Sequence, residues 1–160
     1  MKSKLYVILS ALVLTLTVTG CGVVEDPETA KFESDIQAFC DEVAAIDANI
    51  NNIDATSEHA DEELLEYLDQ LDQSFKVLAE MPIPEEYAYL EELTDEASTY
   101  MSTAVESYHE AFAGDTYDAN IADYAYQNYE RANKRVTVML QLLRGETVTA
   151  DGVVIEQGNE

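Results

Sequence analysis

The spacing of apolar residues between positions 32 and 53 constrains the fold of this chain more than any other feature. These residues recur alternately every four and every three positions, at Phe32, Ile36, Phe39, Val43, Ile46, Ile50 and Ile53. Because this period is close to the 3.6 residues of a helical turn, the side chains fall on one face of a helix, as in a heptad repeat. The segment therefore predicts a long amphipathic helix that packs against other helices.

Three later segments repeat this rhythm, through Leu64–Leu78, Tyr87–Ala111 and Ala122–Leu143. Residues that favour helix ends separate them: Thr56 or Ser57 can cap the second helix, and Asp115 the fourth. Helices are expected at 29–54, 57–81, 84–113 and 116–144, each about 35–45 Å long. Similar lengths and short connections favour an all-α, antiparallel up-down-up-down four-helix bundle over residues 29–145. A dimer of long helical hairpins is the alternative.

The two ends of the chain do not share this pattern. Residues 146–160 alternate in polarity around "ADG", which indicates a flexible or weakly β tail. At the start, Lys2 and Lys4 precede an apolar run of 14 residues from Leu5 to Val18. As a helix this run would cover about 21 Å, less than the roughly 30 Å of a bilayer core. Residues 1–20 are therefore predicted to be a signal peptide and not a membrane span.

The run ends in Val18, Thr19, Gly20 and Cys21. These residues resemble the lipobox of bacterial lipoprotein precursors, in which an aliphatic residue and two small residues precede a cysteine. The resemblance implies cleavage between Gly20 and Cys21 and a diacylglycerol thioether on Cys21, with a fatty acid such as palmitate often added to its amine. It also implies a lipid-anchored protein on the extracytoplasmic face of the membrane, with residues 21–28 as the tether. More loosely, the chain resembles small acidic lipoproteins of Gram-positive bacteria.

The strongly acidic charge of the chain limits the classes of partner that it can bind. After cleavage at Cys21, six Lys and Arg residues would face 33 acidic residues, a formal charge of −27. Such a surface excludes nucleic acid as a partner and repels anionic headgroups, so contact with the bilayer is expected through the Cys21 lipid alone. Cys40 then has no cysteine to pair with, and is expected to be a small buried side chain.

No motif in the chain predicts an enzyme or a cofactor. Glu106 and His109 form a single E-x-x-H pair, whereas di-iron bundles need two such pairs and further inward glutamates. His59 and His109 are both expected at the pole of the bundle far from the membrane. With Glu106 they give a weaker alternative function, the binding or sensing of a divalent cation or small molecule there or among small residues such as Ala97 and Ala125.

The favoured function is a non-enzymatic interaction module whose partner contacts a tyrosine-bearing face of the third and fourth helices. Eight of the ten tyrosines lie between positions 87 and 129. Tyr89, Tyr117 and Tyr126 fall off the apolar stripes and are expected to be exposed, and exposed tyrosines suit interfaces. Arg131, Lys134 and Arg135 should lie beside the acidic start of the third helix and form ion pairs. The pattern leaves the partner and the oligomeric state open.

Overall fold

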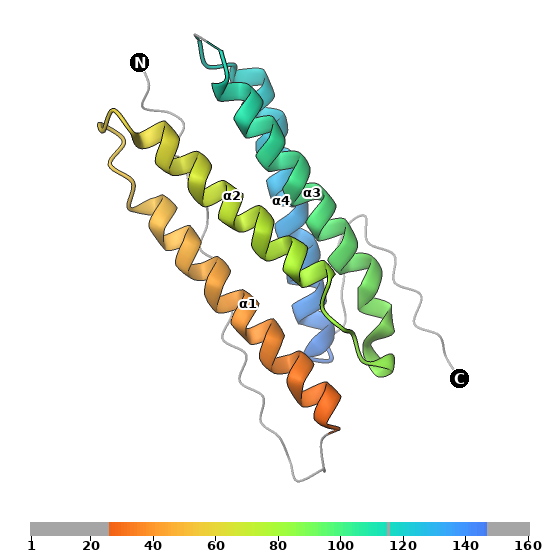
Figure 1. The fold of residues 1–160 in the computed structure, drawn as a ribbon. Coiled ribbons are helices and arrows are strands. Elements are labelled where there is room, and N and C mark those ends of the chain that lie inside the picture. The colour runs from red at the N-terminus through yellow and green to blue at the C-terminus, as the bar shows by residue number, and fades with distance from the viewer. Residues whose placement is uncertain (1–25, 115, 147–160) are drawn as a thin grey trace.

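The computed structural model describes residues 26–114 and 116–146. They form helices α1 (Pro27–Asn51), α2 (Ala60–Ala79), α3 (Glu91–Phe112) and α4 (Ala119–Leu143), with a 3₁₀ helix, η1 (Glu85–Leu90), before α3. The predicted all-α four-helix bundle is confirmed: consecutive helices pack against each other and run in alternating directions (Figure 1). The predicted signal peptide, Cys21 and the tail beyond Glu146 lie outside the described residues.

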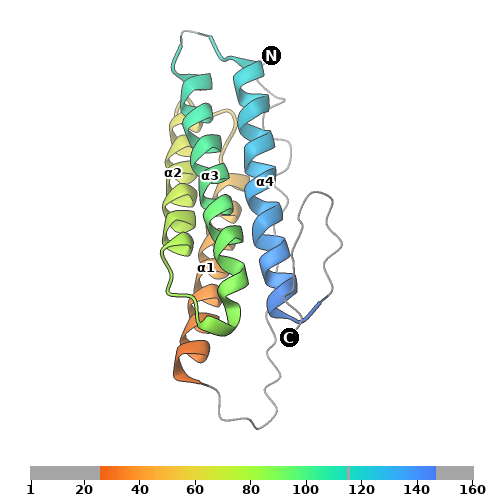
Figure 2. The ribbon, with the colours of Figure 1, turned by 90° about the vertical axis from the view of Figure 1, so that its right-hand side faces the viewer.

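The alternating directions give the bundle two distinct poles. α1 begins, η1 turns and α4 ends at one pole, which we call the N-pole (Figure 2). The α1–α2 and α3–α4 connections lie at the opposite pole. Within the part of the chain that the structure describes, no helix is both long and apolar enough to span a bilayer.

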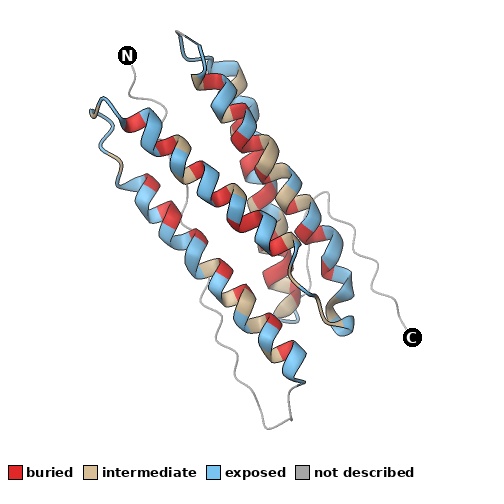
Figure 3. Cartoon of the chain, in the orientation of Figure 1, coloured by how far each residue is buried: buried red, intermediate tan, exposed pale blue. Residues whose placement is uncertain are grey.

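The apolar stripes of the four helices meet in one continuous core (Figure 3). Every predicted stripe residue of α1 and α2 within these helices is buried, from Phe32 to Ile50 and from Leu64 to Leu78. The stripe along η1 and α3 is buried except at Tyr87 and Tyr108, which pack partly buried against the core. Heptad spacing therefore identified the inward face of each helix.

Small residues decide how α3 and α4 pack. Ala97, Ala104 and Ala111 of α3 and Ala122, Ala125 and Ala132 of α4 are all buried. These two helices share the most extensive contacts of any pair, because alanine side chains allow the backbones to approach closely. The alanines thus form a closely packed seam between the two helices.

The observed helix bounds all differ from the predicted ones: η1 precedes α3, which begins at Glu91 instead of 84, and three other ends differ by three residues. α1 stops at Asn51, because Asp54 forms a turn in which its carboxylate accepts hydrogen bonds from the backbone and hydroxyl of Thr56. His59 occupies the N-cap of α2 without a side-chain cap, so neither Thr56 nor Ser57 caps this helix. Asp118, and not Asp115, caps α4 by accepting from the Asn120 and Ile121 amides. Gly145, with φ of 69°, follows the C-cap residue Arg144 of α4.

One acidic residue of α1 is buried where this helix contacts α4. Asp47 is 2% exposed, and its carboxylate accepts a 3.2 Å hydrogen bond from the Tyr129 hydroxyl. Burial raises the pKa of Asp47, although the Tyr129 hydrogen bond acts in the opposite direction. Burial and the nearby Asp47 also raise the pKa of Tyr129, whose hydroxyl interacts with Asn133 as well. The pair links α1 to α4 but keeps a carboxylate away from water, which disfavours its ionised form.

Replacing Asp47 with asparagine should therefore stabilise the fold at neutral pH. A pKa that is raised in the folded state means that stability falls as pH rises from the unfolded value of about 4 through the folded pKa. The asparagine side chain would keep an acceptor for Tyr129 without the charge. We therefore expect the free energy of unfolding to increase by about 1 kcal/mol at neutral pH, which corresponds to a rise in melting temperature of about 4 °C. Near pH 4 the gain should be smaller, because the raised pKa leaves less charge on the wild-type carboxyl there.

Thermal melts followed by circular dichroism at the two pH values measure this difference. Asp41→Asn is the control, because Asp41 is exposed on the same helix and its loss changes the net charge equally. The control should change the melting temperature by less than about 1 °C. If Asp47→Asn lowered stability equally at both pH values, the buried carboxylate would be a structural requirement and the prediction would be wrong.

Candidate functional site

The three tyrosines predicted to contact a partner do not form one surface. Tyr89 lies in η1 at the N-pole, whereas Tyr117 lies in the α3–α4 connection at the opposite pole. Both are exposed, by 43% and 40%. Tyr126 is only partly exposed, and a hydrogen bond to Glu130 raises the pKa of its hydroxyl. Tyr124 of α4 is 51% exposed.

Tyr89 stands out because it borders an open cleft. The cleft encloses about 630 Å³ on the outer side of η1 and the first half of α3. Its described walls include two tyrosines and four acidic residues: Tyr89, Tyr100, Glu91, Glu92, Asp95 and Glu96. Tyr89 belongs to η1, and the other five residues lie on one face of α3, where they recur every three or four positions. Partial burial, and then the charge of Glu86, raise the pKa of Tyr89, so its hydroxyl stays protonated at neutral pH.

Aromatic contacts hold the N-pole end of this cleft against α1. The Tyr87 ring packs on Phe32 of α1 with 5.6 Å between ring centroids, and Tyr89 meets Tyr87 edge-on at 6.3 Å. The Tyr87 hydroxyl donates to the Glu33 carboxylate at 3.5 Å, and the Thr29 hydroxyl donates to Glu86. η1 is therefore fixed to the start of α1 through Tyr87, which leaves the neighbouring Tyr89 facing solvent.

Two arginines of α4 lie over Tyr100, the last of the residues that line the cleft. The guanidinium carbons of Arg131 and Arg135 lie 5.8 and 5.3 Å from the centre of the Tyr100 ring. Arg135 Nε also donates to Glu96 Oε2 at 2.5 Å, and the Arg135 side chain is only 12% exposed. The predicted ion pairing between α4 and the acidic start of α3 is confirmed at this pair. At Tyr100, a guanidinium is held between an aromatic ring and a carboxylate.

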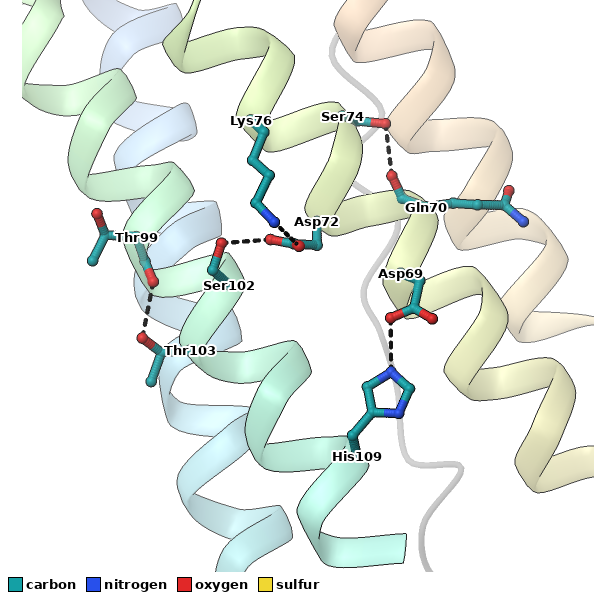
Figure 4. Close-up of polar contacts among 9 residues, drawn as sticks. All are labelled: Asp69, Gln70, Asp72, Ser74, Lys76, Thr99, Ser102, Thr103 and His109. Atoms are coloured by element: carbon teal, nitrogen blue, oxygen red, sulfur yellow. Dashed lines mark hydrogen bonds and ion pairs between the residues drawn. The ribbon is translucent and has the colours of Figure 1, made fainter. Parts of the chain in front are cut away.

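The predicted metal-binding residues are not brought together. His59 Nδ1 lies 2.9 Å from Glu62 Oε2 within α2, whereas His109 Nε2 lies 2.7 Å from Asp69 Oδ1 of α2 (Figure 4). Glu106 contributes to the raised pKa of Lys76, which is due first to Asp72. In the described ranges, no group of three or more His, Cys, Asp or Glu side chains is placed to hold a metal ion.

The His109–Asp69 contact belongs to a polar band along the α2–α3 interface. Beside the His109–Asp69 pair, the Ser102 hydroxyl of α3 donates to Asp72 of α2 at 2.5 Å (Figure 4). Lys76 Nζ pairs with the other oxygen of Asp72 at 2.6 Å. Each carboxylate in this band thus has a hydrogen-bonding partner, so the band aligns two helices and offers no open coordination site.

Comparison of the chain with protein-family models, with curated proteins and with solved structures gives no match. The site must therefore be judged from its own chemistry. The structure adds Tyr100, Glu92 and Asp95 to the residues that sequence reasoning selected. The signal for the two acidic residues was the charge contrast with α4, whereas no local pattern distinguished Tyr100 from the other tyrosines.

Proposed function

We propose that this protein is a lipid-anchored, extracytoplasmic module of the cell envelope that binds a partner without catalysing a reaction. The lipobox-like residues Val18–Cys21 support the anchor, and the absence of any catalytic motif in the sequence supports a binding role. The partner is engaged by the cleft on η1 and α3, which we call the α3 cleft. Its position near the N-pole would hold a partner close to the membrane, because only a few residues separate α1 from Cys21.

The exposure of Tyr89 at the rim of the α3 cleft is the observation that carries this proposal. Most tyrosines of the bundle pack against its core, whereas Tyr89 leaves 43% of its surface in water beside an open cavity. Tyrosine rings lose little conformational entropy on binding and supply both apolar area and a hydroxyl, so they dominate many interfaces. Tyr117 and Tyr126 fall outside this cleft.

Site-specific photocrosslinking in intact cells tests the proposal. A photoreactive phenylalanine analogue at position 89 should form a covalent adduct with a discrete partner. The same analogue at position 124 is the control, because Tyr124 is at least as exposed but lies on α4 away from the cleft. An adduct at position 89 alone would support the proposal. The same adducts at both positions, or none at position 89, would contradict it.

A further inference from the structure

We infer that the α3 cleft accepts an arginine- or lysine-bearing segment of a partner protein, an inference that rests on the proposed function. The cleft presents four carboxylates beside two tyrosine rings. Of these carboxylates, Glu96 is paired with Arg135. In the part of the chain that the structure describes, Glu91, Glu92 and Asp95 have no ion pair with a basic side chain. The cleft therefore holds negative charge that the fold leaves uncompensated.

The chain itself shows which ligand chemistry suits these walls. At the α4 end of the cleft, the Arg135 guanidinium lies over the Tyr100 ring and pairs with Glu96, while Arg131 lies over the same ring. A cation is thus bound by one tyrosine and one carboxylate a single helical turn apart on α3. At the N-pole end of the cleft, Tyr89 of η1 and Glu92 of α3 also place a tyrosine and a carboxylate three residues apart, although in the reverse order along the chain, and Asp95 follows three residues later. A second guanidinium or ammonium has the same two kinds of group available there.

The rest of the molecule favours a cation over other ligands. Phosphates, carboxylates and nucleic acids would meet strong repulsion, since the chain carries a net charge of −25. A simple metal ion lacks a converging set of ligands, because no described group of three acidic, histidine or cysteine side chains is placed to hold one. A flexible basic side chain needs only one carboxylate and one ring face, which the N-pole end of the cleft provides.

Binding of a short arginine–glycine peptide to the detergent-solubilised full chain tests this inference at about 0.15 M salt, where exposed charges are screened beyond about 8 Å. The same peptide with citrulline in place of arginine is the ligand control. Glu92→Gln/Asp95→Asn should lower the affinity about tenfold, and Tyr89→Ala about threefold. Citrulline peptide should bind at least about tenfold more weakly than the arginine peptide.

Matched variants separate the cleft from the general acidity of the protein. Glu63→Gln/Glu66→Gln removes the same charge from exposed positions of α2, and Tyr124→Ala removes an exposed ring from α4. Neither should change the affinity by more than about twofold. Equal losses in cleft and control variants, equal binding of the citrulline peptide, or no binding at all would overturn the inference.

Failure of the inference about a cationic ligand can be distinguished from failure of the proposed function. The peptide crosslinked to position 89 in cells can be identified by mass spectrometry. A crosslinked partner segment with no arginine or lysine would leave the interaction module standing and overturn the cationic ligand. If no partner is crosslinked at position 89, the proposed function fails, whatever the purified protein does with peptides.

Discussion

Replacing Cys21 with alanine should abolish the covalent lipid on this protein. In cells supplied with labelled palmitate, the wild-type chain should carry the label and begin at residue 21, whereas Cys21→Ala should be unlabelled and retain residues 1–20. The chemical basis is that the thioether forms on the cysteine sulfur, which alanine lacks. Without the lipid the chain would also lose its stable anchor, to which each buried CH₂ contributes about 0.8 kcal/mol. Labelling and intact-mass measurement of the purified protein together give the result.

Cys40→Ala is the matched control for this experiment. Cys40 lies partly buried on α1, where burial and then the nearby Asp41 raise the pKa of its thiol to about 11. The thiol is therefore protonated and unreactive at neutral pH, and its loss should leave the label unchanged. Label that persists in Cys21→Ala, or a wild-type protein with its initiator methionine and no lipid, would refute the proposed anchor.

Replacing Phe75 with alanine should lower the free energy of unfolding by about 3–5 kcal/mol. Phe75 is 1% exposed and meets the Phe39 ring edge-on, with 5.3 Å between the ring centroids. The substitution would remove this contact between α2 and α1 and leave a cavity in a core that is packed from all four helices. Denaturant unfolding followed by circular dichroism measures the change.

Val77→Ala tests whether the effect comes from core packing. Val77 lies two residues further along α2 but is 47% exposed, since it points away from the bundle. Its replacement should change the free energy of unfolding by no more than about 0.5 kcal/mol. Comparable losses for the two variants would mean that the observed packing of α2 does not describe the folded protein in solution.

The fold could be predicted in detail where bulky apolar residues set a clear helical period. In α1 and α2, the stripe from Phe32 to Ile50 and that from Leu64 to Leu78 determined the inward face, since only that face could be buried. Helix ends were less predictable, because several capping residues lie close together. Asp115 and Asp118 are equally suitable caps for α4, and the backbone bond from Asp118 N to Ala111 O accompanies the observed start.

The candidate site depended on contacts that local patterns do not contain. Pro84 predicted the start of a helix, but η1 adopts a 3₁₀ form where Tyr87 and Glu86 reach across to α1. The opposite charges of α3 and α4 predicted an ion pair such as Arg135–Glu96. The sequence could not indicate that Tyr100 would lie under two guanidinium groups, since this requires the relative rotation of α3 and α4.

Because of the alanine seam, α3 and α4 are held together more strongly than α1 is held to the rest of the bundle. α3 and α4 are joined along most of their length, whereas α1 makes its main contacts with α2 and reaches α4 through such links as Asp47–Tyr129. The proposed lipid pulls on the start of α1, and the proposed partner is held on α3. Under tension between the membrane and the partner, α1 would therefore detach from the bundle before α3 and α4 separated. The helix pair that binds the partner would stay folded longer than the helix that is tethered to the lipid.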